Sequence, residues 1–569
     1  MIEGGLTLIA IAVAFAWPSL GSGWFARLDR MSAKLSRRPV WSVAAVGTSA
    51  ILFRLAILPI IPIPLRIIPD EFSYWLAADT FSLGRLSNPT PAMWTHFESI
   101  HIDMTPTYMS MYFPAQGLVL AAGKLAFGHP WFGQLIVTGL MCSAICWMLR
   151  AWLPPGWALL GGLIAVLRLG VFSYWINTYT GAGSIAALGG ALVLGALPRL
   201  TRHVRIRDGL LLALGVVVLA TSRPYEGLLL CIPVAVALGR WMCVGKARPT
   251  SVVLMRRAAL PLALVLAAGS WMAYYDYRVN GAALTLPYTI NRATYAVAPY
   301  WIWQSSRQEP IYRHSVLRDF YLQNELPDAE KTLSARGFVP WTLAKAANGI
   351  LFFAGSALLP ALIMMRRVFI DRRMRFLIAC LFTLAAGIMI ETFMLTYYLA
   401  PFTAAFYAIG LQAMRHLRQW KFREQPVGAA MLRFMLAIVF VVPALQVVVG
   451  LVHRAPIDLP RAAWSCGSVV PSHCGTDRAG IESRLEKLPG RQLVIVRYGH
   501  NHFLMNEWVY NAADIDESKV IWAREMKQAE NVELINYYKD RRVWLVQPDL
   551  QPVAVSAYPV TELITGSRR

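Results

Sequence analysis

Two carboxylates stand side by side in the stretch RIIPDEFSY, residues 66–74, directly after a long apolar run. Asp70 and Glu71 follow a proline, which fixes the direction in which the chain leaves that run. A carboxylate held at the boundary between water and lipid is suited to take a proton from an attacking hydroxyl or amine. The alternative is that the pair only marks a helix end in water. The next residues, FSYWLAADTFSLGRL, favour the first interpretation, because their apolar side chains recur at the spacing of a helix lying on a membrane surface.

Other residues whose types are suited to chemistry lie farther along the chain. The stretch WTHFESIHIDM carries four of them, which allow either a metal site or a polar loop that lines a substrate groove: His96, Glu98, His101 and Asp103. Tyr300 and Trp301, in YAVAPYWIWQ, predict either an aromatic wall for a sugar or isoprenoid or an interfacial aromatic belt. Glu391 is the one acid inside a late apolar run and is a secondary candidate.

Composition indicates which kind of molecule must position these residues. Of 569 residues, 56% are hydrophobic and only 15% are charged, and the mean hydropathy is +0.46. A soluble domain of this size cannot bury so much apolar surface, so the sequence predicts a polytopic α-helical membrane protein. The net charge of +22 would suit nucleic acid in a soluble chain. Here the basic residues cluster in short loops between apolar runs, so nucleic acid is not an expected partner.

The apolar runs predict roughly 11–13 transmembrane helices. Five basic loops, at 27–38, 199–207, 240–257, 366–375 and 415–423, are expected to face the cytoplasm. The run at 40–64 then ends on the outer side, just before the carboxylate pair, and the run at 428–452 delivers the C-terminal tail to the same side. The arginines of the second loop fit this orientation only if one run between 112 and 198 does not cross fully. The run at 112–128, interrupted by Lys124, is a candidate for that partial helix.

The tail differs in composition from the rest, and we expect a domain boundary at about 452. Residues 1–452 form the membrane region, with outer loops at about 66–111 and 276–344, and 453–569 form a small α/β domain. RQLVIVR, KVIWA and RVWLVQ predict strands, and ESRLEKL and REMKQAENVELINYY predict helices. Cys466 and Cys474, in WSCGSVVPSHCG, are expected to form a disulfide in an oxidising compartment. A zinc site with His473 is the less favoured alternative, because no second cysteine pair is near.

Several of these features together resemble the GT-C superfamily of glycosyltransferases. They are the Asp-Glu pair opening the first outer loop, the helix after it, the stretch PTYMSMYFPAQGLVLAAG, the many apolar runs and the outer C-terminal domain. The chain is most similar to the branch that contains protein O-mannosyltransferases and bacterial lipid A aminoarabinose transferases. The architectural resemblance covers most of 40–452, and the motif resemblance is strongest at PDEFSY. This chain has Tyr112-Phe113-Pro114-Ala115-Gln116 where the family commonly shows His-Pro-Pro.

The resemblance implies the transfer of a hexosyl or pentosyl group, with inversion, from a polyprenyl-phosphate-linked sugar to an acceptor outside the membrane. It implies Asp70 as the general base and Glu71 as a residue that orients the acceptor or the base. The departing phosphate needs positive charge and hydrogen-bond donors. Arg66, Arg223 and Arg292 are the candidates. Arg223 stands in TSRPYEG, and an ion pair with Glu226 is its other possible role.

The family branch does not generally depend on a metal, so no metal or cofactor is expected, and the residues of WTHFESIHIDM are expected to line the acceptor groove. Tyr300 and Trp301 are assigned to sugar binding. The expected partners are the lipid-linked donor, a glycan, lipid or protein acceptor of the cell envelope, and membrane lipid. The expected place is the bacterial inner membrane, with the active site and the C-terminal domain extracytoplasmic. The alternative is a flippase or transporter of lipid-linked sugar, which would need neither a general base nor an outer domain.

Overall fold

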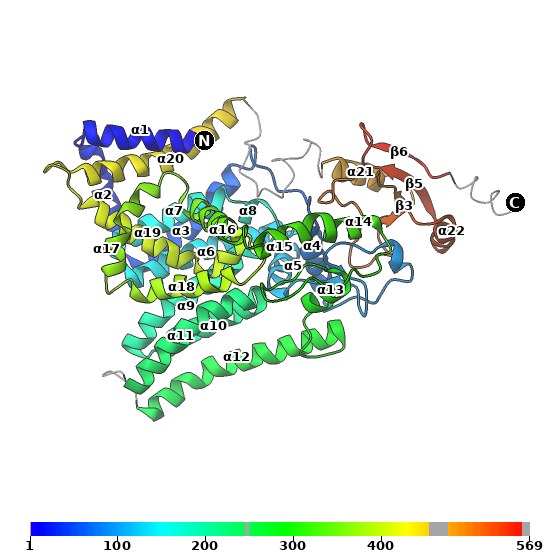
Figure 1. Cartoon of the computed structure of the whole chain (residues 1–569), viewed down its shortest axis with the longest axis horizontal. Coiled ribbons are helices and arrows are strands. Elements are labelled where there is room, and N and C mark those ends of the chain that lie inside the picture. Colours follow the sequence, from blue (N-terminus) through cyan, green and yellow to red (C-terminus); the bar gives the residue numbers. More distant parts are fainter. Residues whose placement is uncertain (1, 245–249, 454–475, 560–569) are drawn as a thin grey trace.

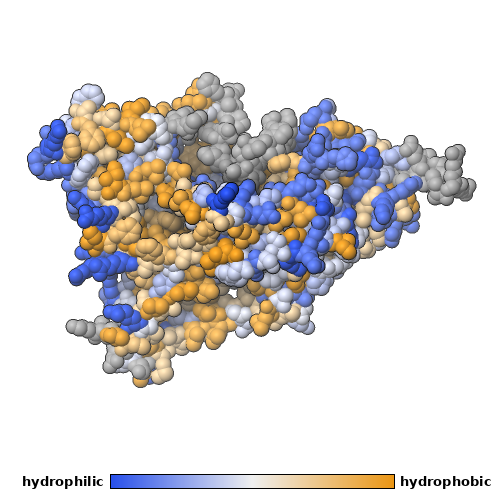
Figure 2. All heavy atoms as spheres, in the orientation of Figure 1, coloured by the Kyte–Doolittle hydropathy of each residue, from blue (hydrophilic) through white to orange (hydrophobic). Residues whose placement is uncertain are grey.

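The computed structural model describes residues 2–244, 250–453 and 476–559. Helices make up the larger part of the molecule. The C-terminal residues form a small sheet with accompanying helices, and this unit lies at one end of the molecule (Figure 1). Apolar side chains cover much of the helical body, whereas hydrophilic ones gather over the C-terminal end (Figure 2). This distribution is that of a helical membrane protein with a domain outside the lipid.

Seven helical segments of the described residues are long and apolar enough to cross a membrane. They are α3 (Pro39–Ala56), α6 (Trp131–Trp152), the segment Pro155–Asn177 with α7 (Pro155–Ala165) and α8 (Tyr174–Asn177), α9 (Gly183–His203), α11 (Pro224–Val244), α12 (Ser251–Asn280) and α20 (Val427–His453). An eighth span results if the bent pair Phe338–Ala354 and Leu359–Ile370 counts as one. The polytopic helical fold is confirmed, with fewer full-length spans than the roughly 11–13 expected from apolar runs.

Short and bent helices account for the difference in number. The run at 112–128 forms α5 (Pro114–Phe127), whose 14 residues are about 21 Å long, whereas the hydrocarbon core is about 30 Å thick. Other apolar runs form α1 (Ile2–Ala16), α10 (Ile206–Ser222), α18 (Arg375–Met389) and α19 (Thr403–Arg418), which are of 15 to 17 residues. The remaining helices of the body are α2 (Ser22–Arg37), α16 (Phe338–Ala354) and α17 (Met365–Ile370).

α5 lies very close to α6, because two glycines face each other. An added Cβ on Gly123 would be 2.2 Å from the backbone N of Gly133, and one on Gly133 would be 1.9 Å from the carbonyl oxygen of Val119. Lys124 on the same helix donates a 2.8 Å hydrogen bond to Asp79 on α4 (Pro69–Ser82). α5 is therefore fixed between the helical body and the helix that carries the carboxylate pair.

The first long loop contains α4, the turn η1 (Trp94–His96) and the antiparallel strands β1 (Ile102–Asp103) and β2 (Met109–Ser110). The predicted helix after the carboxylates is α4, but it is not laid on a surface. Its side chains are buried on nearly every face, against α5, β2 and the C-terminal domain. The second loop forms α13 (Pro287–Tyr295), α14 (Ser315–Asp319), η3 (Phe320–Glu325) and α15 (Leu326–Leu333).

The C-terminal domain is an α/β domain, as the sequence predicts, and its sheet has four strands. Its strands β3 (Arg491–Val496), β4 (Val520–Arg524), β5 (Arg541–Gln547) and β6 (Ala554–Ala557) stand in the order β4-β3-β5-β6, and only β6 is antiparallel. The helices α21 (Thr476–Lys487) and α22 (Gln528–Tyr537) accompany it. Cys466 and Cys474 lie outside the described residues, so the disulfide stays a prediction.

Candidate active site

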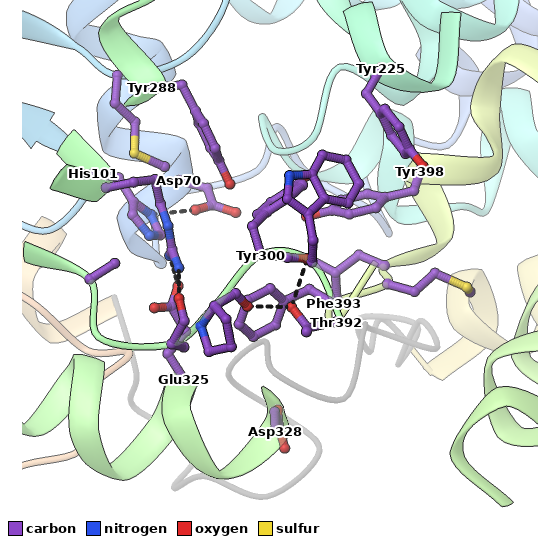
Figure 3. Close-up of a pocket in the computed structure, with 18 of the residues that line it drawn as sticks. Asp70, His101, Tyr225, Tyr288, Tyr300, Glu325, Asp328, Thr392, Phe393 and Tyr398 are labelled. Carbon is purple, nitrogen blue, oxygen red and sulfur yellow. Dashed lines mark hydrogen bonds and ion pairs between the residues drawn. The ribbon is translucent and has the colours of Figure 1, made fainter. Parts of the chain in front are cut away.

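A cavity of about 960 Å³ lies where the two long loops meet the ends of the helices. α4 contributes Asp70, the start of α11 contributes the TSRPYEG turn, and the segment after α18 contributes aromatic residues. Figure 3 shows Asp70 and His101 pointing toward each other, with the rings of Tyr225 and Tyr398 at the other side of the cavity. Six of the residues predicted from the sequence line it: Asp70, His101, Arg223, Arg292, Tyr300 and Trp301.

Three side chains donate hydrogen bonds to the carboxylate of Asp70. The hydroxyl of Tyr112 lies 2.5 Å from Oδ1, Nδ1 of His101 lies 2.7 Å from the same oxygen, and the hydroxyl of Thr180 lies 3.0 Å from Oδ2. Burial by itself raises the pKa of Asp70, but His101 and the three hydrogen bonds outweigh it and hold this pKa below its usual value. Asp70 is therefore an ionised, buried carboxylate that faces a cavity.

Tyr112 keeps its proton in this arrangement. Burial and the neighbouring carboxylate of Asp70 hold the pKa of Tyr112 well above 10. The phenol is consequently a donor to Asp70 at any ordinary pH. Tyr112 belongs to the YFPAQ stretch, the place at which this chain departs from the family pattern.

Glu71 faces away from the cavity. Its Oε2 accepts hydrogen bonds from the backbone N–H groups of Ile67 and Ile68, and its Oε1 accepts one from the N–H of Tyr179. Burial raises the pKa of Glu71 to about 7, although the three N–H groups act in the opposite direction. Glu71 thus caps the N-terminus of α4 and fixes the helix to a distant loop.

That loop connects three candidate residues through consecutive positions. The N–H of Tyr179 binds Glu71, the hydroxyl of Thr180 binds Asp70, and the carbonyl of Gly181 accepts hydrogen bonds of 3.2 and 3.0 Å from Arg223. Gly181 has a φ of 79°, and an added Cβ would lie 2.3 Å from the ring of Tyr397. Only glycine fits both conditions. Segment 179–181 therefore sets the distance between the carboxylate and the guanidinium.

Two of the three predicted arginines belong to the cavity, and both are already paired. Arg223 lies 3.5 Å from Glu226 and stacks on Tyr397, with 4.3 Å between its Cζ and the ring centroid. Arg292 forms an ion pair with Glu325 and donates a 2.9 Å hydrogen bond to the carbonyl of Ala298. Both roles left open for Arg223 are thus compatible with its position.

Arg66 lies elsewhere. Its guanidinium is 3.4 Å from Glu482 on α21, and its Cζ lies over the rings of Phe72 and Trp75 at 5.4 and 4.6 Å. The arginine therefore contacts the C-terminal domain instead of the cavity, and its assignment to a donor phosphate receives no support from its position.

The stretch WTHFESIHIDM is divided between two environments. Only His101 reaches the cavity, whereas His96 lies 3.1 Å from the carbonyl of Arg524 in the C-terminal domain. Glu98 accepts hydrogen bonds from Tyr295 and Arg313, at 2.9 and 3.1 Å, and Asp103 accepts one from Asn291 at 2.9 Å. These three side chains hold the loop in place. In the part of the chain that the structure describes, no three His, Cys, Asp or Glu side chains converge to hold a metal ion.

An aromatic wall closes the cavity on the side away from Asp70. Trp301 stacks on Trp303 with 5.4 Å between ring centroids, and Tyr225 lies edge-on to it at 4.8 Å. Tyr300 donates a hydrogen bond to Glu391, which lies behind it. Lys345 also lines the cavity and donates to the carbonyl of Glu391 at 2.9 Å. The secondary candidate Glu391 thus supports the wall.

No family model matches this chain, and no curated protein matches it in sequence. Among solved structures it is similar to the oligosaccharyltransferase of Archaeoglobus fulgidus tethered with an acceptor peptide, at 10% identity and a TM-score of 0.46, over 89% of this chain and 68% of that one. It is similar to ArnT of Cupriavidus metallidurans bound to undecaprenyl phosphate, at 13% identity and a TM-score of 0.43, over 91% of this chain and 94% of that one. It is also similar to the arabinosyltransferase EmbB of Mycobacterium smegmatis, at 15% identity and a TM-score of 0.36, over 73% of this chain and 39% of that one.

Sequence reasoning missed Tyr112, Thr180 and Lys345 as site residues. Tyr112 had a signal, because it opens the one motif that departs from the family pattern. Thr180 stands in YTGAG, between two apolar runs, and its contact with Asp70 spans 110 positions. Nothing in the local sequence indicates such a contact. Lys345 stands alone in an apolar helix, and a polar residue at that depth is a signal that a search for intramembrane charges would find.

Proposed function

We propose that this chain is a membrane glycosyltransferase that moves a hexosyl or pentosyl group from a polyprenyl-phosphate-linked donor to a glycan, lipid or protein acceptor. The observation that carries the proposal is a single cavity that holds an ionised carboxylate, the guanidinium groups of Arg223 and Arg292, and an aromatic wall. We place the cavity and the C-terminal domain on the outer face of a bacterial inner membrane, because the basic loops are expected to be cytoplasmic.

Asp70 is the general base in this proposal. The oxygen of an acceptor hydroxyl forms a bond to the anomeric carbon while the bond from that carbon to the phosphate oxygen breaks. The lipid phosphate leaves with the bonding electrons, and the hydroxyl proton passes to the carboxylate of Asp70. Attack on the face opposite the phosphate inverts the anomeric carbon. The low pKa of Asp70 means that the base is ready over most of the pH range, and that it takes the proton only as the new bond forms.

Arg223 and Arg292 stabilise the departing phosphate. Negative charge develops on the phosphate oxygens as the bond breaks, and guanidinium groups in a cavity of low dielectric constant stabilise it strongly. Each guanidinium has five N–H groups, more than the protein partners of Arg223 and Arg292 occupy. The aromatic wall offers flat apolar faces to the sugar ring or to the first isoprene units.

The proposal is tested by deleting the protein from its host and analysing lipid-linked sugars and envelope glycans by mass spectrometry. We expect one polyprenyl-phosphate sugar to accumulate and one glycan modification to disappear. Wild-type protein should reverse both changes. Asp70→Asn should not, because Asn has similar shape but cannot take a proton, and a base contributes about 10²- to 10⁴-fold to the rate.

Two controls separate catalysis from folding and from transport. Purified Asp70→Asn protein should still bind undecaprenyl phosphate, which shows that the cavity is formed. Glu71→Gln should lose less activity than Asp70→Asn, because Glu71 contacts backbone groups only. If Asp70→Asn transfers sugar at nearly the wild-type rate, Asp70 is not the base. If the variant instead retains flux of a lipid-linked sugar across the membrane and no transfer is found for the wild type, the chain is a flippase or transporter.

A further inference from the structure

We propose that His101, together with Tyr112, determines which oxygen of Asp70 takes the proton, and that this oxygen is Oδ2. His101 is then a positioning residue of the base. The inference rests on the proposed function and adds to it a role for a histidine in the first outer loop. Three distances carry it: Nδ1 of His101 and the hydroxyl of Tyr112 lie 2.7 and 2.5 Å from Oδ1, and the hydroxyl of Thr180 lies 3.0 Å from Oδ2.

The number of lone pairs on the carboxylate leads to the assignment. Each oxygen of an ionised carboxylate has two lone-pair directions. Two protein donors already converge on Oδ1. On Oδ2 only one is occupied, by Thr180. The one direction left for the hydroxyl of an acceptor is therefore on Oδ2, and Asp70 presents it in a single orientation.

His101 is a donor in this arrangement. A nitrogen 2.7 Å from the oxygen of an ionised carboxylate must carry the shared proton. The hydroxyl of Tyr112 is also 3.1 Å from this nitrogen. Because that hydroxyl gives its own proton to Asp70, the two donors meet at Oδ1 without competing for it.

The backbone holds the histidine in this position at a cost. His101 has a φ of 64°, in the left-handed region that residues other than glycine and asparagine seldom adopt. Its carbonyl accepts a 2.6 Å hydrogen bond from Ser73 on α4, three residues after Asp70, and its ring lies edge-on to Phe320 on η3. The same helix thus holds both the carboxylate and the loop that carries its donor.

Few charged groups lie near the imidazole. The titratable side chains in contact with it are Asp70 on α4 and Tyr112 before α5, and η3 presents the apolar ring of Phe320. Farther across the cavity stand two ion pairs, Arg223 with Glu226 and Arg292 with Glu325, and three further charged side chains, those of Arg307, Asp328 and Lys345. Each pair is balanced in charge, so the loss of His101 acts on Asp70 through the contact at Oδ1.

Two substitutions at one position test the inference. His101→Gly keeps the left-handed backbone without strain but removes the donor. His101→Asn keeps the left-handed backbone and also a donor. Asparagine tolerates this conformation, and its side-chain N–H₂ group is placed close to the position of Nδ1 in histidine. Full-length purified protein is assayed with undecaprenyl-phosphate hexoses and pentoses as donors, over a range of pH.

We expect His101→Gly to lower kcat about 10- to 100-fold with the KM for the donor unchanged, and His101→Asn to stay within about threefold of the wild type. Loss of a donor destabilises the ionised carboxylate and so raises the pKa of Asp70. The acidic limb of the kcat/KM profile should therefore move to higher pH in His101→Gly and in Tyr112→Phe. A residue that only fills space would not move this limb.

Equal losses in His101→Gly and His101→Asn, or an unmoved acidic limb, overturn the inference, because the hydrogen bond would then not matter. An active His101→Gly beside an inactive Asp70→Asn also overturns it, while the proposed function stands. If no donor is transferred by the wild type and deletion leaves the lipid-linked sugars unchanged, the proposed function itself fails, and the inference with it.

Discussion

Asp70 and Glu71 are neighbours in the chain, but their carboxyl groups have different partners on different sides of one helix. Successive residues of an α-helix point about 100° apart, so only one of two adjacent side chains can face the cavity. Asp70 faces it and accepts hydrogen bonds from side chains, whereas Glu71 accepts them from backbone N–H groups. The sequence resemblance implies Asp70 as the base and Glu71 as a residue that orients the acceptor or the base, and the hydrogen bonds of Glu71 go to backbone groups instead of the cavity.

At Arg223, a second residue with two possible roles, the pairing with Glu226 and the binding of phosphate can be separated. Arg223→Ala should weaken the binding of undecaprenyl phosphate about 10-fold or more, because a charge-assisted hydrogen bond in a buried cavity is lost. Arg223→Lys should keep part of the affinity, since the point charge remains without the planar fork. Native mass spectrometry of the purified variants measures the affinity.

Glu226→Gln is the matched control for Arg223. It removes the charge of the ion-pair partner, which is 3.5 Å away, and leaves the guanidinium in place. We expect it to keep most of the phosphate affinity. If Arg223→Ala and Glu226→Gln destabilise the protein equally and donor affinity is unchanged in the arginine variant, Arg223 has a structural role only.

At the scale of elements, the sequence predicts a helix after the carboxylate pair and the strands β3, β4 and β5 of the C-terminal domain from their local patterns, but it does not predict that α4 is buried on nearly every face. It predicts too many full spans, since an apolar run does not reveal where a helix bends or stops. It also assigns the four polar residues of WTHFESIHIDM to one groove, although only His101 reaches it. The loop folds into η1 and β1, and its polar side chains point to different neighbours. Their positions depend on contacts with residues far along the chain: His96 contacts Arg524, and Asp103 contacts Asn291.

Segment 179–181 should be intolerant of even one methyl group. Gly181→Ala would place a Cβ 2.3 Å from the ring of Tyr397, at a φ of 79°. We expect nearly complete loss of transfer, because Thr180 and the carbonyl of Gly181 would move away from Asp70 and Arg223 together. Activity and thermal unfolding of the purified variant are the measurements.

Gly281→Ala supplies the control. Gly281 has a φ of 78°, and an added Cβ there would meet nothing within 4 Å. This variant carries the same conformational penalty of about 1 kcal/mol without the collision, so it should remain active. Equal activity of the two alanine variants would show that segment 179–181 does not position the site.

At the scale of the whole molecule, the C-terminal domain packs directly on α4, the helix that carries Asp70. Phe72, two residues after Asp70, stacks on Tyr510 with 4.2 Å between ring centroids, and Arg478 lies over the same phenyl ring. The hydroxyl of Tyr510 donates to the carbonyl of Ile100 at 3.2 Å, next to His101. The domain thus supports both Asp70 and its donor from outside the cavity.

Tyr510→Ala should lower the free energy of unfolding by about 3 kcal/mol, as for other buried aromatic residues. It should also lower kcat more than it weakens binding of undecaprenyl phosphate, because the arginines of the cavity lie on other elements. Tyr537→Ala, a substitution of a half-exposed tyrosine on α22, should change both quantities little. A Tyr510→Ala protein with wild-type kcat and lowered stability would mean that the domain stabilises the chain without positioning α4.

The stacking of Tyr510 on Phe72 has a consequence for how the protein is made. The two residues are separated by more than four hundred positions, and every described membrane helix is encoded between them or before them. Tyr510, whose ring packs on the helix that carries Asp70, is synthesised after all of these membrane helices. The contact between Phe72 and Tyr510 therefore forms only after translation has passed Tyr510, and a product truncated after the last described membrane helix would lack it.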